Sequence, residues 1–291
     1  MIPTSEVTFC IPTYNQPEKL KRCLETLYKH TPEGFRVIVL DQGKDEELYG
    51  KIKEWTHLYI KAYRNLGFAK ACNYMARLAD TAYVCFLNDD VEFINQKWWK
   101  GVSDTFERYD KDEPQVLCVN PGSMRKLNGV GTPVDNEFPY KPDYTEEEYD
   151  AMVALESGGR GDLGIIVDGI TPWCAIFHLQ GFKDVGMFDE AFYPGGGEDY
   201  DLQNRAYLKH RTQGLRRHRC LGTSLSIAWH WWCSTKSTIG GEHSSFKIFQ
   251  EASNLYQEKW GTPEHPNPYP NGTQSKTIEQ LDRPESTIKP L

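Results

Sequence analysis

The chain has 291 residues, enough to bury a sizeable α/β core, and a formal net charge of −8. The acidic balance spreads over both halves, so the long basic stripe typical of a nucleic-acid binder is missing and nucleic acid is not an expected partner. The eight cysteines show no C-x-x-C spacing, and no stretch approaches the about 20 apolar residues that span a bilayer. We therefore expect a reducing, cytoplasmic location, with peripheral membrane association left open.

The N-terminal part of the chain alternates short apolar runs with helical patterns. The run Val7–Ile11 predicts a buried strand that Pro12 closes. A helix is expected to begin at Pro17, because apolar residues follow it at the helical spacing i, i+3, i+4, i+7 and i+8. Two more apolar runs, Arg36–Leu40 and Leu58–Ala62, predict the second and third strands.

The alternation continues with a helical stripe from Phe68 to Ala79 and a strongly apolar strand, Ala82–Leu87. Strands alternating with helices argue for a mainly parallel sheet, whose ligand loops lie at the carboxyl ends of the strands. Three polar segments follow strands in this way: Pro12–Asn15, Asp41–Lys44 and Asn88–Asp90. We expect them to converge on one crevice.

The second half of the chain is less regular. From Pro121 to Asp168 it is rich in Gly, Pro, Tyr and acidic residues, and it reads as surface or lid structure. Beyond it the pattern predicts a strand, a helix and a second strand, at Trp173–Leu179, Asp199–His210 and Leu221–Trp229. The polar, Pro-rich stretch after Trp260 is expected to be extended or disordered.

Asn88, Asp89 and Asp90 come directly after a predicted buried strand. Carboxylate oxygens suit Mg²⁺ or Mn²⁺, and a cation bound there stabilises the charge that develops on a nucleotide diphosphate leaving group. Asn and Asp are also common turn residues, so a plain turn explains the trio about as well.

A second acidic pair, Glu198 and Asp199, follows three glycines in the segment Tyr193–Asp201 (YPGGGEDYD). Glycines let the backbone approach a ligand closely, and a carboxylate opposite a metal can take a proton from an acceptor hydroxyl. An ordinary Gly-rich loop before a helix is the alternative. That alternative predicts no acidic partner elsewhere, whereas Asn88–Asp90 is one, so we favour the functional interpretation.

His230 lies among tryptophans at the end of the last predicted strand. A neutral imidazole can complete a metal site, although a histidine in this setting is more often packed, and His243 competes for the role. The tryptophans suit a platform for a sugar face or core packing equally. Neither a G-x-x-x-x-G-K-[ST] loop nor a G-x-G-x-x-G after the first strand occurs, so other nucleotide chemistries lack their motifs.

Taken in order, these segments resemble the GT-A glycosyltransferases of family 2, especially the rhamnosyltransferase-like members. The resemblance covers roughly residues 5–235 and rests on Ile11–Asn15 (IPTYN), Val39–Gly43 (VLDQG), Asn65–Asn73 (NLGFAKACN), Phe86–Phe93 (FLNDDVEF), Val185–Glu190 (VGMFDE) and Gly196–Leu202 (GGEDYDL). It implies an α/β fold of GT-A type, with a Rossmann-like, mainly parallel central sheet flanked by helices. The implied parts are a nucleotide-sugar-binding half (1–120), an acceptor-binding and catalytic half (121–235) and a C-terminal extension with a partly disordered tail (236–291).

The resemblance also implies roles for individual residues. Asp199 matches the catalytic base, Glu198 the residue that orients hydroxyls, and Asp90 and His230 the ligands of Mn²⁺ or Mg²⁺. The implied donor-binding residues are Pro12, Tyr14, Asp41, Asn65, Lys70, Asn88 and Asp89. Asn88 replaces the first acid of the commoner D-x-D, which removes one charge from the surroundings of the metal.

The leading hypothesis is therefore a metal-dependent, inverting glycosyltransferase of polysaccharide biosynthesis. It would move a sugar from a UDP- or dTDP-sugar to a hydroxyl of a glycan or lipid-linked acceptor, with Asp199 as base. The alternative is a non-catalytic nucleotide- or carbohydrate-binding module on the same fold, against which the Glu198–Asp199 pair argues. A sugar nucleotidyltransferase would need a Gly- and Arg-rich loop after the first strand, and Pro12–Asn15 is not one.

Overall fold

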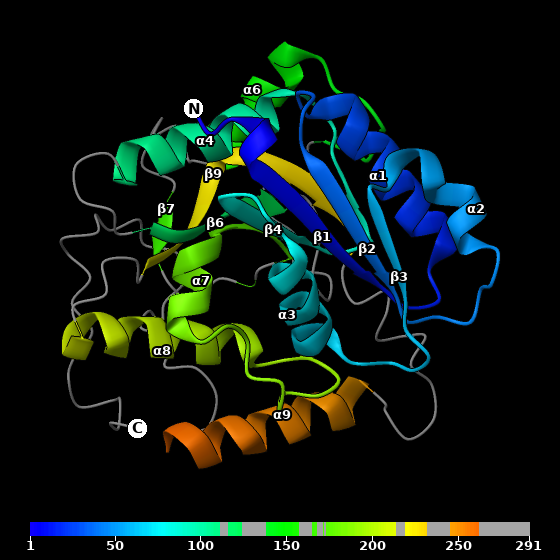
Figure 1. Ribbon diagram of the computed structural model, residues 1–291. Helices are drawn as coiled ribbons and strands as arrows, with labels where there is room; N and C mark the ends of the chain where they lie inside the picture. The colour runs from blue at the N-terminus through cyan, green and yellow to red at the C-terminus, as the bar shows by residue number, and fades with distance from the viewer. Residues whose placement is uncertain are drawn as a thin grey trace.

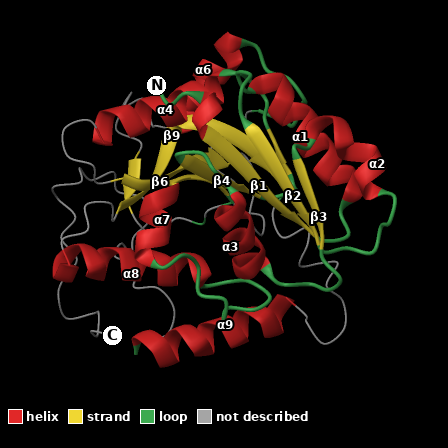
Figure 2. Cartoon of the chain, viewed as in Figure 1, coloured by secondary structure: helices red, strands yellow, loops and turns green. Residues whose placement is uncertain are grey.

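A mixed β-sheet forms the centre of the protein, and helices cover both of its faces (Figure 1, Figure 2). The computed structural model describes residues 1–110, 116–123, 138–156, 165–167, 171, 173–213, 219–231 and 245–261. Within these ranges the sheet has nine strands in the order β3-β2-β1-β4-β8-β6-β9-β5, and β7 pairs with β9. This architecture confirms the predicted α/β fold.

The described strands are β1 (Val7–Thr13), β2 (Arg36–Asp41), β3 (Leu58–Lys61), β4 (Tyr83–Leu87), β5 (Val91–Glu92), β6 (Val116–Ser123), β7 (Ile165–Val167), β8 (Cys174–His178) and β9 (Arg219–His230). The described α-helices are α1 (Pro17–His30), α2 (Leu48–Ile52), α3 (Phe68–Leu78), α4 (Lys97–Asp110), α6 (Glu146–Glu156), α7 (Leu179–Val185), α8 (Glu198–Gln213) and α9 (Ser245–Trp260). Short 3₁₀ turns lie at Thr4–Glu6 and Lys53–Trp55.

The first four strands of the sheet are parallel, as the alternation of strands and helices predicts. β1 pairs in parallel with β2 and with β4, and β2 pairs in parallel with β3. One boundary differs from the prediction, because Pro12 lies inside β1 rather than closing it. Pairing with β4 ends at Cys10–Phe86, so Pro12 lies where β1 has one partner strand instead of two, a position that tolerates the missing N–H.

Side chains of successive strand residues point to opposite faces of the sheet and build two separate cores. On one face, Phe9 and Ile11 pack with the apolar sides of α1, α2, α4 and α6. On the other face, Cys10 and Phe86 pack with α3, α7 and α8. Helices on both faces explain why these strands read as continuous apolar runs rather than alternating ones.

The second half of the sheet is mostly antiparallel. β8 runs antiparallel to both β4 and β6, and β9 is antiparallel to β5 and β7 but parallel to β6. The interpretation of residues 121–168 as surface or lid structure is wrong for part of that segment. Residues 121–123 belong to β6, and α6 places Tyr149 and Met152 in the core, where the Tyr149 hydroxyl donates to the Ile227 carbonyl at 3.1 Å.

The cysteines and the C-terminal region complete the fold. All seven cysteines in the described ranges are buried free thiols, as predicted, and Cys233 lies outside those ranges. The predicted helix at 199–210 is α8, and the predicted last strand is β9. Helix α9 was not predicted, and the stretch after Trp260 that we expect to be extended falls almost wholly outside the described residues.

Candidate active site

The carboxyl ends of β1, β2 and β4 bring the three predicted polar segments together. Thr13 at the end of β1 lies beside Asp41 at the end of β2 in the parallel register. Thr13 also donates its hydroxyl hydrogen to Asp89 Oδ2 at 2.7 Å, across to the segment that follows β4. The three segments therefore meet at one end of the sheet, as predicted, while a crevice at that end stays a prediction.

Two adjacent carboxylates, Asp89 and Asp90, are buried in this place. Burial and the neighbouring Asp90 raise the pKa of the Asp89 carboxyl to about 7, although the bonds from Thr13 and from the Tyr14 backbone lower it. Both effects disfavour two negative charges in a poorly solvated position, and a bound cation would remove the penalty.

Asn88, Asp90 and His230 meet at one point, although 142 residues separate Asn88 from His230. The imidazole Nε2 lies 3.2 Å from Asp90 Oδ1 and 3.3 Å from the Asn88 side-chain amide. Strand pairing fixes this meeting, because Val91 of β5 lies opposite His230 of β9 and the Trp231 N–H donates to the Asp90 carbonyl at 2.9 Å. His230 is 2% exposed and Asp90 4% exposed.

Trp173 completes the surroundings of this cluster. Its carbonyl accepts a hydrogen bond from the Asn88 N–H at 2.9 Å, and its ring stacks on the His230 imidazole with centroids 4.8 Å apart and planes at 18°. Sequence reasoning placed Trp173 at the start of a strand but did not connect it with the site. The signal available in the sequence was an aromatic side chain at the very start of a predicted strand.

Trp229 and Trp231, the neighbours of His230 in the described residues, make contacts of their own. Trp229 is 9% exposed and packs against Tyr140 and Trp231, with ring centroids 4.8 and 5.6 Å apart. The Trp231 indole donates to Glu92 Oε1 at 2.7 Å. Of the two interpretations left open, core packing is therefore correct for Trp229, while Trp232 and His243 lie outside the described residues.

Asp41, implied to hold the nucleoside, is an anchored acceptor at the end of β2. Its Oδ2 accepts hydrogen bonds from Tyr59 at 2.6 Å and Lys61 at 2.8 Å, and its Oδ1 accepts the Gly43 N–H at 2.7 Å. Burial and the bond to Asp41 raise the pKa of the Tyr59 phenol, which keeps it a donor. Sequence reasoning missed Tyr59 and Lys61, although the register of β3 on β2 places Lys61 beside Asp41.

The remaining implied donor-binding residues lie in different settings. Tyr14 is half-buried just after β1, whereas Pro12 is buried inside that strand. The Asn65 side chain accepts a backbone N–H two residues further on, at 2.8 Å, and so shapes the turn before α3. The Lys70 ammonium, half exposed in the first turn of α3, lies 3.7 Å from Glu190 Oε2.

The glycine run Gly195–Gly197 turns the chain into α8, where Glu198 and Asp199 form the first turn. All three glycines have positive φ values, 155°, 114° and 89°, and at 114° and 89° a side chain would be strained. The Glu198 carboxylate accepts the Gly196 N–H, and Asp199 Oδ1 accepts the Tyr200 N–H at 2.9 Å. Backbone N–H groups of the glycine run and of the first turn thus fix both carboxylates.

Hydrogen bonds and short stretches of chain together connect the two acidic clusters along the carboxyl ends of the strands. The carbonyl of Thr13, the residue that binds Asp89, accepts the Gln42 N–H at 3.0 Å. In turn, Gln42 Oε1 accepts the Leu66 N–H at 2.6 Å. At the start of α3, the Phe68 N–H donates to the carbonyl of Pro194 at 2.8 Å, just before the glycine run. Asn88–Asp90 and Glu198–Asp199 are therefore parts of one structural unit.

Few of the described side chains at this place can bind a metal ion. Among the residues that the structure describes, no three His, Cys, Asp or Glu side chains group so as to hold a metal ion. Asp90 and His230 supply two such groups, and Asn88 adds an amide where the commoner motif has an acid.

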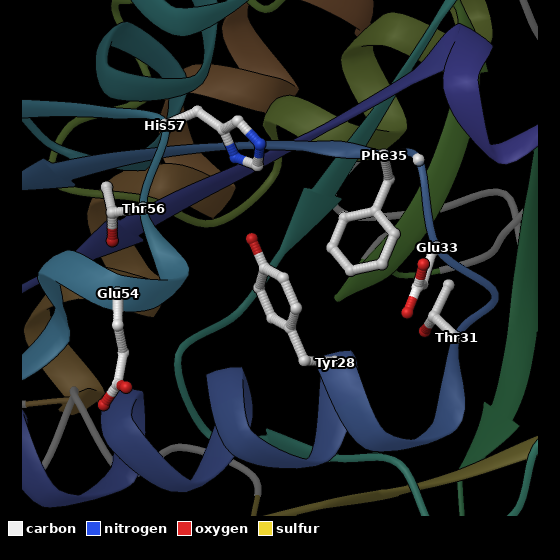
Figure 3. A pocket seen from close by; sticks show the side chains of 8 residues that line it. Tyr28, Thr31, Glu33, Phe35, Glu54, Thr56 and His57 are labelled. Carbon is white, nitrogen blue, oxygen red and sulfur yellow. The ribbon is translucent and has the colours of Figure 1, made fainter.

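A separate cavity of about 470 Å³ lies at the opposite, amino end of the strands (Figure 3). It is lined by Tyr28 of α1, Phe35 before β2, and Thr56 and His57 before β3, with Glu33 and Glu54 at its rim. The pairing register places this cavity away from the carboxyl ends, so it is not part of the candidate active site.

Solved structures of GT-A glycosyltransferases share this architecture. The chain aligns with GalNAc-T7 in complex with UDP, GalNAc and Mn²⁺ at a TM-score of 0.59 and 15% identity, covering 87% of this chain and 48% of that one. It aligns with S. aureus TarS 1-349 in complex with UDP-GlcNAc at a TM-score of 0.53 and 19% identity, covering 91% of this chain and 69% of that one. It aligns with the mannosyltransferase PcManGT from Pyrobaculum calidifontis, in complex with GDP-Man and Mn²⁺, at a TM-score of 0.50 and 14% identity. That alignment covers 87% of this chain and 69% of the other. At these identities the likeness shows the fold.

The family follows from the sequence comparison. The profile described as "Glycosyl transferase family 2" matches residues 8–156, more than half of the chain, so the chain belongs to glycosyltransferase family 2. The chain is also 23% identical over 244 residues to Glycosyltransferase GlyA of Streptococcus pneumoniae serotype 4, covering 79% of this chain and 32% of that protein. It thus spans about a third of the length of that relative. None of the helices in the described ranges is both long enough and apolar enough to cross a membrane.

Proposed function

We propose that the chain transfers a sugar from a nucleotide diphosphate sugar, a UDP- or dTDP-sugar, to a hydroxyl of a glycan or lipid-linked acceptor. The observation that carries the proposal is the approach of His230 to Asp90 at 3.2 Å, on the same end of the sheet as Glu198 and Asp199. Neighbouring structures contain UDP or GDP-Man together with Mn²⁺, which supports this class of donor. Buried free cysteines fit a reducing compartment such as the cytoplasm.

The donor atoms of Asp90 and His230 suit a divalent cation, Mn²⁺ or Mg²⁺. Around an octahedral cation bound at about 2.0–2.1 Å, neighbouring ligand atoms lie about 3 Å apart. The separation of 3.2 Å from His230 Nε2 to Asp90 Oδ1 is close to that spacing. A cation bound there would neutralise the charge of the departing diphosphate.

Asp199 is proposed as the base of a direct displacement. Its carboxylate takes the proton of the acceptor hydroxyl while the hydroxyl oxygen attacks the anomeric carbon and the bond to the diphosphate breaks. One base is sufficient and no enzyme nucleophile is needed, so the configuration at the anomeric carbon inverts. The Tyr200 N–H fixes one Asp199 oxygen, and Glu198, fixed by the Gly196 N–H, orients the reacting hydroxyls.

The assignments are tested by two substitutions with a common control. Asp199→Asn keeps the shape of the side chain, and its kcat should fall about 10²- to 10⁴-fold, the usual loss for a general base, while Mn²⁺ and UDP still bind. Asp90→Ala should lose Mn²⁺-dependent binding of UDP in calorimetry. Asp104→Asn, which changes a half-buried carboxylate of α4, should match the parent chain in both assays. Near-normal turnover by Asp199→Asn removes it as base, and unchanged UDP binding by Asp90→Ala removes the metal assignment.

A further inference from the structure

Helix α9 lies beyond the family match at 8–156 and packs against the start of α8 (Figure 1). Its Ala252 faces the glycine run. A Cβ atom built on Gly196 would lie 3.6 Å from Ala252 Cβ, and one built on Gly197 would lie 3.9 Å from it. Helix α9 therefore contacts the backbone that immediately precedes Glu198.

The end of α9 binds the first turn of α8 through Asp201. The Trp260 indole N–H donates to Asp201 Oδ1 at 3.0 Å, and the Lys259 ammonium lies 2.7 Å from the same oxygen. Arg205 Nε donates to Asp201 Oδ2 at 2.8 Å. Asp201 is 0% exposed, so these donors replace its contacts with water, and removing one leaves a buried polar group poorly compensated.

Two further contacts join the same elements. Lys259 also lies 2.7 Å from Asp189 Oδ2, in the segment before the glycine run. Phe192, Tyr256 and Trp260 form a small buried cluster of their own. The Phe192 ring lies 2.9 Å from a Cβ atom built on Gly197, so this cluster packs against the glycine run.

We infer that α9 positions Glu198 and Asp199, with Lys259 and Trp260 as positioning residues. This rests on the proposed role of Asp199 as base. Asp201 is two residues beyond Asp199 in the same turn, and its N–H donates to the Gly197 carbonyl at 3.0 Å, so a shift of Asp201 moves the turn. A displacement of about 1 Å at a reacting group can cost about 10²-fold in rate.

The test uses graded substitutions in the full chain. Trp260→Phe removes the indole N–H and keeps an aromatic ring, Lys259→Met removes the charge and keeps the stem, and Lys259→Arg keeps the charge. Lys247→Met is the control, since Lys247 is exposed on the same helix and forms an ion pair with Glu251. For each variant, kcat, donor KM and hydrogen exchange of the amides of residues 196–203 are measured.

We expect kcat to fall about tenfold or more in Trp260→Phe and Lys259→Met, with donor KM unchanged and faster exchange over residues 196–203. Lys259→Arg should recover most of both signals, and Lys247→Met should change neither. A purely structural role would lower the melting temperature but leave the kcat of the folded protein intact. Such a result, or unaltered exchange in Lys259→Met, overturns the inference. Because exchange needs no turnover, it decides the role of α9 even if Asp199→Asn retains activity and the proposed function fails.

Discussion

Gly67 lies at the contact between the turn before α3 and the loop that leads to the catalytic pair. Its φ is 79°, in the left-handed region. A Cβ atom built there would lie 2.9 Å from Tyr193 Cδ2, 3.0 Å from the Pro194 carbonyl oxygen and 3.3 Å from Pro194 Cα. Gly67→Ala therefore introduces backbone strain, a clash with the Tyr193 ring and tight contacts with the main chain of Pro194.

The expected cost combines two contributions. A left-handed conformation costs a residue with a side chain about 1–2 kcal/mol, and overpacking costs about 1–3 kcal/mol. Their sum lowers the free energy of unfolding by about 2–5 kcal/mol. For a domain of this size, each kcal/mol shifts the melting temperature by about 2–4 °C, so Gly67→Ala should melt about 4–20 °C lower.

Thermal unfolding followed by circular dichroism measures this effect, with Gly50→Ala as the matched control. Gly50 lies in α2, and a Cβ atom there meets nothing within 4 Å, so alanine should stabilise the chain by up to about 1 kcal/mol. The kcat of Gly67→Ala should also fall, because displacing Pro194 shifts the glycine run. A melting temperature of Gly67→Ala equal to that of the parent chain would refute the described contact between the two loops.

Three further substitutions test other parts of the structure. Gly101→Ala should be strongly destabilising in urea unfolding despite its helical position, because its Cβ would lie 2.0 Å from the Leu225 carbonyl oxygen; a stabilised variant contradicts this packing. Tyr59→Phe should lower the free energy of unfolding by about 1.5 kcal/mol through loss of the bond to Asp41, and no loss in urea titrations argues against that bond. Burial lowers the pKa of His30, so the native state favours the neutral imidazole. The unfolded chain binds a proton at His30 below about pH 6.5, so the stability that His30 contributes is lost as pH falls below that value. The stability difference between the parent chain and His30→Asn should therefore shrink from pH 7.5 to 5.5. A constant difference would rule out a lowered pKa of His30 in the native state.

Local patterns were sufficient for the first half of the fold. Helix α1 begins at Pro17 as predicted, and its apolar positions Leu20, Cys23, Leu24 and Leu27 are all buried. The parallel order of the first strands follows from the alternation of strands and helices, so the convergence of Asn88–Asp90 with Asp41 was also predictable. These features follow from local patterns and from the general rule that strands alternating with helices form a parallel sheet.

Features set by distant contacts were not predictable. The sequence Glu146–Glu156 has no clear apolar stripe, and the burial of Tyr149 depends on β9, almost 80 residues away. The role of α9 depends on the buried carboxylate of Asp201, which resembles any acidic residue in a first helical turn when read from sequence. In the site, His230 stood out as a candidate, but its stacking on Trp173 requires the pairing of strands from three parts of the chain.

The most direct test of the central claim is hydrolysis or transfer of a panel of nucleotide sugars by the purified chain, measured with Mn²⁺ and with EDTA. The account predicts turnover of at least one UDP- or dTDP-sugar with Mn²⁺, its loss in EDTA, and a decrease of about 10²-fold or more in Asp199→Asn. Turnover that persists in EDTA and in Asp199→Asn would contradict it. Tight nucleotide-sugar binding without any turnover would instead favour a non-catalytic binding module.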